Sequence, residues 1–479
     1  MKLIYDVEDR MGFGKLVVFA VQQLLAIMAA TLVVPMIVGN EMKSEAALFG
    51  AGVGTLVYVA FTKKKSPVFL GSSFAFLGSM AAAFAGGVSM EVGYLGLILG
   101  AVFAGLVYVA IAAVVKVVGV EWINKLMPAV VIGPTVAIIG LSLAGNAIGD
   151  LTSGEVFRTE AKEVLCPACE TVLDAATESV QLASPLVTIF CGLVTLLVTI
   201  LCSVYGKKTL KLIPFIMGIL AGYVTAAVLT GIGNAAGVNA LKVMSFEPLT
   251  GLVKNAEGAF AITPSTFFSV PEFTFLTALG GFKEITGSYI GTIAVAYIPV
   301  AFVVFAEHIA DHKNISSIIE RDLLKEPGLS RTLLGDGVGS IAGAIFGGCP
   351  NTTYGESVGC VAITKNASVI TIIAAAIGAM LISFLSPFVA FVNSIPSCVM
   401  GGVCMALYGF IAVSGLKMLQ QVDLGEDRNL FVVSTILIAG IGGLSVSFGK
   451  IELTSVACAL LLGIFVNWML SRKKPETKE

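Results

Sequence analysis

Residues 347–365 read GGCPNTTYGESVGCVAITK, a polar segment inside an otherwise apolar region of the chain. Two glycines and a proline exclude a regular helix at its start, and residues 351–354 are polar and favour extended backbone. Gly355 then opens a short helical pattern, which places the acidic Glu356 at membrane depth. Broken backbone is tolerated there only where it is buried in protein or lines a cavity, and a buried carboxylate is usually functional. We therefore interpret this segment as half of a substrate site.

The composition indicates the class of protein. Of the 479 residues, 57% are hydrophobic and 13% are charged, whereas soluble domains carry roughly 25% charged residues. The chain is therefore predicted to be an integral membrane protein with many helical spans in contact with lipid. Its 31 acidic and 29 basic residues nearly cancel, which gives no indication of a nucleic-acid partner.

Apolar segments of membrane-spanning length recur along nearly the whole chain. Two shorter segments, near residues 68–85 and 350–365, are interrupted by Gly, Ser, Thr or Pro, and we interpret them as broken spans three and ten. Including them, the sequence predicts fourteen spans. The continuous spans are expected at 16–38, 46–62, 92–115, 129–149, 185–205, 212–232, 289–312, 332–346, 367–390, 396–415, 430–447 and 452–470.

The placement of Lys and Arg supports this assignment. If the N-terminus is cytoplasmic, 22 of the 29 basic residues fall in segments on the inner side, which is a clear positive-inside bias. Both termini are then expected in the cytoplasm, and the long loops 150–184 and 233–288 are expected outside. The basic residues expected on the outer side are Lys43, Arg158, Lys162, Lys242, Lys254, Lys283 and Lys450.

The two halves of the chain also resemble one another. The hexapeptide PAVVIG at residues 128–133 recurs as PSCVMG at residues 396–401, and each half carries one broken span. Seven spans per repeat is an odd number, so the second copy must be inverted in the membrane. Inverted repeats with discontinuous helices are typical of secondary transporters, whose sites lie near the midplane of the bilayer.

The first-half counterpart of residues 351–356 is residues 70–76, LGSSFAF. Both segments place small polar and aromatic residues just ahead of a short helix. Two such segments facing each other can pair their backbones, and each would then direct the positive N-terminus of its half-helix toward a shared point. A purely structural role is the alternative, in which Ser and Thr only satisfy helix backbone and packing.

Glu307 lies inside an apolar helical pattern, residues 298–312, and shares a face with Asp311, four residues on. Solvation does not explain an acidic residue a full turn inside this span. His308 and His312 have the same spacing and raise the alternative of a zinc site, but the sequence supplies no third ligand. Asp311 and His312, with the basic residue that follows, are expected to form a solvated helix end.

Two further sequence patterns bear on function. The only CxxC motif, Cys166–Cys169, lies in the first outer loop and lacks the second pair of a zinc ribbon and the context of a redox motif. A loop disulfide or unpaired thiols are its expected state. The sequence contains no GxxxxGK[ST] phosphate-binding loop, so transport driven by ATP has no support in this chain.

With these residues described, the sequence resembles the nucleobase–ascorbate transporter family (nucleobase:cation symporter 2), and within it the uracil permease branch. The resemblance covers nearly the whole chain, and the 350–356 motif with its continuation to residue 364 matches the family signature. The other matching motifs are GSSFAF at 71–76, AEH at 306–308 and DLLKEPG at 322–328.

The resemblance implies an all-α polytopic fold of fourteen spans in two inverted seven-helix repeats, with two short facing strands in broken spans three and ten. It divides the chain into a core domain and a gate domain that alternate access to the site. The core comprises residues 1–126 (spans 1–4) and 289–392 (spans 8–11), and the gate comprises residues 127–288 (spans 5–7) and 393–479 (spans 12–14 and the tail).

The resemblance also implies the activity: import of uracil by proton symport across the cell membrane, without a cofactor, a metal or an enzymatic step, and possible assembly as a homodimer. Proton coupling is expected at Glu307, with Asp311 as a helper. The implied substrate-binding residues are Glu307, Glu356, Phe74, Gly355, Tyr354, Ser73 and Tyr408. Two positions depart from the family pattern, since Ser357 replaces an asparagine and Asp311 replaces a histidine.

The chemistry of uracil agrees with such a site. Its ring alternates N–H donors and C=O acceptors, so carboxylates and backbone N–H groups together can satisfy it. A carboxyl group at low dielectric favours its neutral form and can therefore carry a proton near neutral pH. The alternatives are a purine substrate such as xanthine or urate, coupling to sodium, or an anion exchanger of the same fold, against which the acidic pair argues. A membrane enzyme would need a metal cluster or a nucleophile–base pair, and the sequence contains neither.

Overall fold

A computed structural model describes residues 3–119, 122, 128–165, 172–207, 209–254, 259–448 and 451–471. The described chain is mostly helical, and eight of its helices are long and apolar enough to cross a membrane. The predicted class, a helical membrane protein with short facing strands, is confirmed. The chain forms two compact units: Met1–Leu143, Phe268–Leu385 and Leu407–Glu479 make unit 1, and Ala144–Phe267 and Ser386–Ala406 make unit 2.

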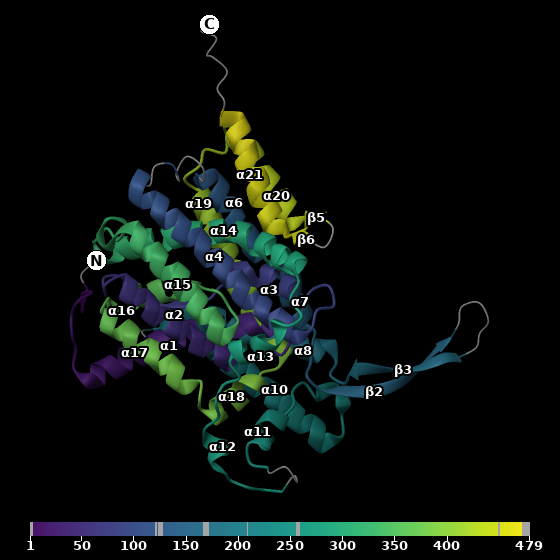
Figure 1. Ribbon diagram of the computed structural model, residues 1–479. Coiled ribbons are helices and arrows are strands. Elements are labelled where there is room, and N and C mark those ends of the chain that lie inside the picture. Colours follow the sequence, from purple (N-terminus) through teal and green to yellow (C-terminus); the bar gives the residue numbers. More distant parts are fainter. Residues whose placement is uncertain are drawn as a thin grey trace. The chain divides into compact units, whose positions relative to one another are not determined.

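Unit 1 contains the elements that carry the two broken spans, and Figure 1 shows α1, α2, α15, α16 and α17 gathered side by side. The division into core and gate domains stays a prediction. The elements of unit 1 are α1 (Phe13–Val38), α2 (Ser44–Phe61), β1 (Leu70–Ser72), η1 (Phe74–Phe76), α3 (Leu77–Ala83), α4 (Met90–Val118), α6 (Ala129–Ser142), α13 (Thr274–Gly281), α14 (Gly287–Ile319), η3 (Leu324–Gly328), α15 (Leu329–Gly347), β4 (Asn351–Thr353), α16 (Gly355–Thr364), α17 (Val369–Ile382), the later part of α19 (Ser397–Leu419), α20 (Asp427–Ile441), β5 (Val446–Phe448), β6 (Ile451–Leu453) and α21 (Ser455–Ser471).

Unit 2 is built on two long helices that pack against each other, α8 and α10, in which threonines of α8 face glycines of α10. It also carries an antiparallel hairpin, β2–β3, in the first predicted outer loop. Its elements are α7 (Ala144–Leu151), β2 (Phe157–Leu165), β3 (Val172–Gln181), α8 (Pro185–Tyr205), α9 (Thr209–Leu212), α10 (Pro214–Ala236), η2 (Asn239–Leu241), α11 (Glu247–Gly251), α12 (Pro264–Phe267), α18 (Ser386–Asn393) and the first part of α19.

The predicted facing strands pair as expected. β1 and β4 form an antiparallel two-stranded sheet, in which Leu70 lies opposite Thr353 and Ser72 lies opposite Asn351. A backbone bond from Ser73 N to the Pro350 carbonyl, 2.9 Å long, extends the pair at one end. Both strands are buried and each leads into a short helical segment, because the residues after them return to helical spacing.

The outer edge of β1 and the residue before it also have partners, as a buried backbone requires. Thr55 of α2 accepts a hydrogen bond from Leu70 N at 2.9 Å and donates to the Leu70 carbonyl at 3.1 Å. Ser357 Oγ accepts from Phe69 N at 3.0 Å. Side chains of neighbouring helices therefore do for these strands what further strands would do in a larger sheet.

Glycines bring α2 and α15 into close contact beside the strands. A Cβ added at Gly50 would lie 2.4 Å from the Gly343 carbonyl oxygen, and one at Gly54 would lie 2.6 Å from that of Gly339. Small residues let membrane helices approach closely, and Gly50 and Gly54 have this packing role between α2 and α15. The Asn351 side chain fills the same groove and donates to the Gly50 carbonyl at 3.2 Å.

One predicted span is wrong in detail. The sequence predicts a continuous helix over 367–390, but α17 ends at Ile382 and α18 begins at Ser386. Pro387 explains the break, because proline cannot continue a helix and is favoured in the first turn of a new one. The repeated hexapeptides at residues 128–133 and 396–401 agree with the structure. Each opens with a proline, and α6 and α19 begin directly after it.

The N-terminal segment lies along the connection between α16 and α17. Ile4 N donates to the Lys365 carbonyl at 2.8 Å, and Val369 N donates to the Val7 carbonyl at 3.0 Å. Arg321, just after α14, forms an ion pair with Asp6 at 2.6 Å. The first residues of the chain therefore tie together two connections from its second half.

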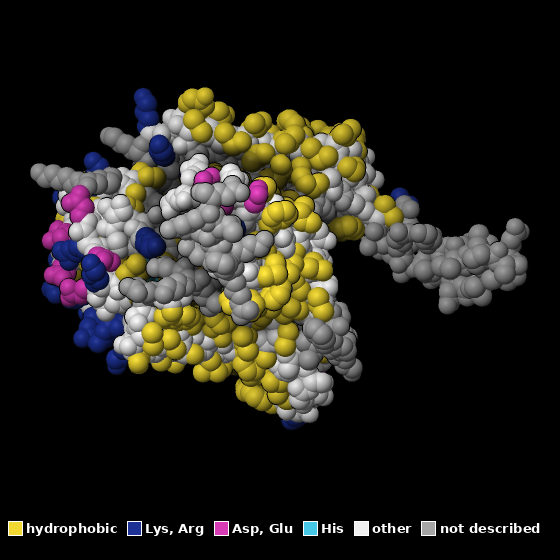
Figure 2. All heavy atoms as spheres, turned by 90° about the horizontal axis from the view of Figure 1, so that it is seen from above, with side chains coloured by type: hydrophobic (Ala, Val, Ile, Leu, Met, Phe, Trp, Pro, Cys, Tyr) yellow, Lys and Arg dark blue, Asp and Glu magenta, His cyan; other side chains and the backbone are white. Residues whose placement is uncertain are grey.

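The surface agrees with a protein that spans a membrane. Figure 2 shows hydrophobic side chains over broad areas of the face it presents, while the charged side chains gather toward one side of that view. Large hydrophobic side chains such as Leu186, Ile438 and Phe465 are exposed on long helices. In water such a surface would be unfavourable, and lipid is its natural surrounding.

We expect Gly71→Ala to destabilise unit 1. A Cβ at this position would lie 2.4 Å from the ring of Tyr354, whose buried hydroxyl is held by the Ser72 carbonyl at 2.7 Å. Overpacking of this kind costs about 1–3 kcal/mol. Thermal unfolding in detergent measures it, with Gly359→Ala of α16 as the control, because a Cβ there meets nothing within 4 Å. Equal melting temperatures for the two variants would contradict the close contact.

Candidate functional site

Three carboxyl groups of unit 1, on α14 and α16, lie near one another. Glu307 and Asp311 share a face of α14, and Glu356 is in the first turn of α16. Glu307 and Glu356 are partly exposed, whereas Asp311 is buried. Glu356 lies close enough to both α14 carboxyl groups to interact with them electrostatically. The structure therefore brings together the acidic residues that the sequence places in two separate spans.

The N-terminus of α16 opens beside these carboxyl groups. Gly355 is exposed, and a Cβ added to it would meet nothing closer than Asp311 Oδ1, at 3.9 Å. Thr353, at the end of β4, donates to Asp311 Oδ2 at 2.8 Å and so fixes the orientation of that side chain. The first backbone N–H groups of a helix have no partner within it, so this end of α16 can bind a carbonyl oxygen or an anion.

Two aromatic rings lie in contact just after β1. The rings of Phe74 and Tyr408 meet edge to face, with centroids 6.0 Å apart and planes at 80°. Both side chains are almost fully buried. Phe74 is placed by the turn that follows β1, and Tyr408 comes from the later part of α19. Such a pair can form one wall of a site for a flat ring.

Tyr354 and Ser73, which the sequence also predicts as substrate-binding, lie at the junction of the strands. The Tyr354 ring packs on Gly71, and its hydroxyl donates to the Ser72 carbonyl at 2.7 Å. Ser73 is fully buried, and among the described residues its Oγ has no hydrogen-bond partner. Tyr354 thus braces the two strands, while the Ser73 hydroxyl is left with unused hydrogen-bonding capacity.

Sequence reasoning missed the partner of Ser357. Gln23 of α1 donates to Ser357 Oγ at 2.5 Å, so this hydroxyl accepts from both Gln23 and Phe69 N. Gln23 is 2% exposed. A glutamine in the middle of the apolar 16–38 segment was the available signal, because a polar amide at membrane depth must find a partner. Ser357 is shorter than the asparagine of the family pattern, and the long side chain of Gln23 reaches it from α1.

The expected solvated helix end at Asp311 and His312 is wrong. The helix α14 continues to Ile319, and Asp311 and His312 are 7% and 0% exposed. The apolar pattern of the sequence ends at this point, but the helix continues. The Asp311 and His312 side chains are buried because other polar groups of the protein form hydrogen bonds with them. His312 Nε2 lies 2.7 Å from the Tyr58 hydroxyl, and its Nδ1 donates to the His308 carbonyl at 2.8 Å.

The two histidines do not form a metal site with other side chains among the described residues, where no group of three or more candidate ligands occurs. Their rings stack with centroids 4.0 Å apart. All four ring nitrogens have partners within the protein: Asp336, Thr332, the His308 carbonyl and Tyr58. The Cys166–Cys169 motif lies outside the described residues.

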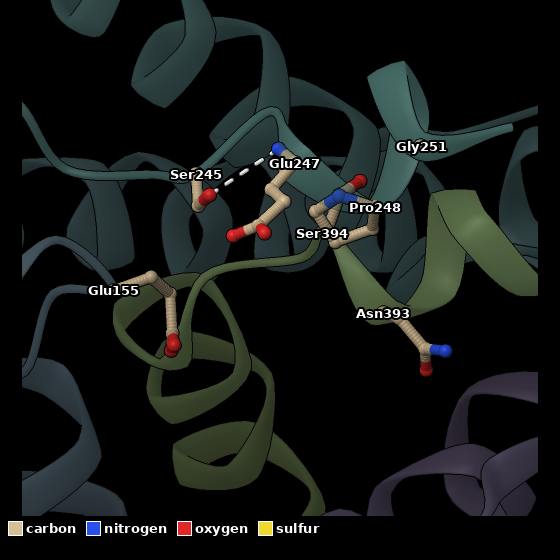
Figure 3. Close-up of a pocket in the computed structure, with 7 residues that line it drawn as sticks. All are labelled: Glu155, Ser245, Glu247, Pro248, Gly251, Asn393 and Ser394. Carbon is tan, nitrogen blue, oxygen red and sulfur yellow. Dashed lines mark hydrogen bonds between the residues drawn. The ribbon is translucent and has the colours of Figure 1, made fainter. Parts of the chain in front are cut away.

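Unit 2 has a separate polar pocket of about 390 Å³, shown in Figure 3. Glu155 and Glu247 project into it from different segments, and Glu155 Oε1 accepts from Ser397 N at 3.0 Å. None of the site residues predicted from the sequence lines it. Glu155 therefore binds the backbone at the start of α19. The carboxyl cluster of unit 1 remains the candidate substrate site.

Comparison with known proteins agrees with these features. The model of a family described as "Permease family" matches residues 14–448. The chain is 35% identical over 473 residues to a uracil permease of Bacillus caldolyticus, covering 98% of this chain and 95% of the relative. It is 35% identical over 462 residues to a uracil permease of Bacillus subtilis (strain 168), covering 96% and 93%.

Solved structures of other transporters share the fold. The transmembrane domain of the cyanobacterial bicarbonate transporter BicA matches with a TM-score of 0.58 at 11% identity, covering 96% of this chain and 100% of that domain. The murine anion transporter Slc26a9, in its inward-facing state, matches with a TM-score of 0.60 at 11% identity, covering 97% and 69%. At this identity the likeness shows the fold alone.

We expect Ser357→Ala to lower the stability of unit 1. The substitution leaves the Phe69 N–H and the Gln23 amide without their acceptor, at about 1–3 kcal/mol for each stranded donor. Ser434→Ala is the matched control, because the Ser434 hydroxyl donates to the Leu430 carbonyl of its own helix, on an exposed face of α20. Denaturation in detergent should separate the two variants clearly, and equal stabilities would contradict the role of Ser357.

Proposed function

This chain belongs to the nucleobase–ascorbate transporter family, and from that premise we propose that it is a secondary transporter that imports uracil by proton symport. The named relatives are uracil permeases and not enzymes, and they match nearly the full chain. The single observation that carries the proposal is that Glu307 of α14 lies within electrostatic reach of Glu356, in the first turn of α16, where Gly355 is exposed.

Uracil matches the chemistry of this site. Its ring N–H groups need acceptors, which Glu307 and Glu356 supply, and its carbonyl oxygens need donors, which the backbone N–H groups from Gly355 onward supply. The Phe74–Tyr408 pair offers an apolar wall to the planar ring. Ser73 contributes the hydroxyl that has no other partner among the described residues, and Tyr354 supports the strands from which these groups project.

The same geometry supports proton coupling. Three mutually repelling carboxylates cannot all ionise in a low-dielectric site without a large cost, so at least one binds a proton. Glu307 is the proposed carrier, because it lies on the open side of α14, while Asp311 is already held by Thr353. Protonated from outside and deprotonated inside, Glu307 removes the cost of moving a bare carboxylate during alternating access of the core and gate domains. Both termini would lie in the cytoplasm, and the protein in the cell membrane.

The alternatives differ in substrate or in ion. A purine such as xanthine needs more room beside the ring, and a sodium-coupled transporter needs an oxygen-rich ion site. Competition of labelled uracil uptake by xanthine, thymine and urate tests the first alternative. Uptake driven by a sodium gradient at equal pH tests the second. Strong competition by xanthine, or uptake driven by sodium, would overturn the corresponding part of the proposal.

We expect Glu356→Gln to weaken uracil binding. The amide keeps the size of the side chain but offers one acceptor in place of two, which strands a ring N–H at about 1–3 kcal/mol, roughly ten- to a hundredfold in affinity. Glu426→Gln, an exposed carboxylate in the loop before α20, is the matched control. Binding measured by calorimetry within about twofold of the native protein would contradict the assignment of Glu356.

We expect Glu307→Gln to uncouple transport. The amide mimics the permanently protonated carboxyl, so the variant should exchange uracil across vesicle membranes without concentrating it in response to a pH gradient. Asp311→Asn is the comparison, and it should retain accumulation, because the amide oxygen of asparagine can replace Asp311 Oδ2 as the acceptor for Thr353. Accumulation driven by pH in the Glu307→Gln vesicles would mean that another group carries the proton.

A further inference from the structure

A second set of titratable groups lies beside the candidate site, on the adjoining face of α14. His308 Nδ1 lies 2.6 Å from Asp336 Oδ2, and His308 Nε2 lies 3.0 Å from Thr332 Oγ1. Thr332 and Asp336 are one turn apart on α15, which packs against α2 and α4. We call these three residues the Thr332–His308–Asp336 triad. Neither the substrate chemistry nor the coupling described above uses it.

The triad is sealed from solvent. All three side chains are 0% exposed, and within the described part of the chain Asp336 Oδ1 has no hydrogen-bond partner. No Lys or Arg forms an ion pair with Asp336 among the described residues; its only such contact is His308. The other titratable groups around it, from α2, α4 and α14, are Tyr58, Tyr108, Glu307, Asp311 and His312.

The hydrogen bonds of the triad can be completed in two ways. In the first, the Thr332 hydroxyl donates to His308 Nε2, and His308 Nδ1–H donates to an ionised Asp336. In the second, the Thr332 hydroxyl donates to the Leu329 carbonyl, 3.0 Å away, and accepts from His308 Nε2–H. A proton must then also lie between His308 Nδ1 and Asp336 Oδ2, because two lone pairs do not approach to 2.6 Å.

These two arrangements differ by one proton, and the rotation of one hydroxyl converts between them. The first leaves a net negative charge at a fully buried carboxylate whose Oδ1 has no partner, which is a costly state. The second is neutral overall, whether the proton lies on His308 or on Asp336. The geometry points to the second arrangement: the triad is a proton-binding site that holds one proton beside Glu307 and Asp311 in this conformation.

The site has a consequence for its neighbours. A neutral triad adds no further negative charge to a region that already contains Glu307, Asp311 and Glu356. Because Thr332 can turn toward either acceptor, the proton can leave without stranding the histidine. This inference concerns the protonation of unit 1 and holds whatever substrate the protein carries.

Nuclear magnetic resonance of the full-length protein in lipid bilayers tests the inference. The chain has only two histidines, so labelling histidine with ¹⁵N reports His308 and His312 alone, and His312→Gln assigns the two sets of signals. His312 is an internal reference, because its Nδ1 faces a carbonyl oxygen and must carry the hydrogen. At about pH 7, without substrate, we expect His308 to carry a hydrogen on Nε2, unlike His312.

A titration and one variant complete the test. On raising the pH above about 7, the native protein should lose the shared proton, and His308 should change to the Nδ1–H form. In Asp336→Asn no proton can be shared, so the His308 signals should not change over the same range. The inference is overturned if His308 at about pH 7 shows the same Nδ1–H form as His312, or if Asp336→Asn titrates as the native protein does. Both readings are independent of uracil transport.

Discussion

The structure of unit 1 depends on one constraint: a backbone that leaves the helical conformation at membrane depth must still have every hydrogen bond satisfied. β1 and β4 satisfy each other along their shared edge. On the outer side of β1 the partners are side chains, with Thr55 on both backbone groups of Leu70 and Ser357 on Phe69 N. The small polar residues of the two broken spans are therefore needed for the backbone itself, before any ligand is considered.

This arrangement also places the functional groups. Each strand ends where a short helical segment begins, so β1 leads directly to Phe74 of η1 and β4 leads directly to the N-terminus of α16. The long helix α14 then presents two different faces. Asp311 bonds to Thr353 at the end of β4, and His308 and His312 bond to side chains of α15 and α2. One helix thus carries the partly exposed Glu307 together with titratable groups that are buried.

Much of this could be predicted from the sequence, because the signals are local. Gly, Pro and Thr around residues 350–354 interrupt an apolar run, which predicts the strand, and an acidic residue in such a run predicts the site. The contacts of Gln23 with Ser357 and of His308 with Asp336 could not be predicted, since they join residues that no spacing rule relates. The predicted solvated helix end at His312 was wrong for a related reason. His312 is buried by residues distant in the sequence, which local composition does not indicate.

The pairing of β1 with β4 has a consequence for how the protein is made. Tyr354, which donates a hydrogen bond to the Ser72 carbonyl, is 282 positions further along the chain. At about 5–20 residues per second the ribosome needs roughly 15–60 s to synthesise the chain between them. During that interval the first broken span sits in the membrane without its strand partner, and the N-terminal segment waits still longer for Lys365. Insertion of the first half therefore leaves the backbone of β1 without its strand partner until the second half is synthesised.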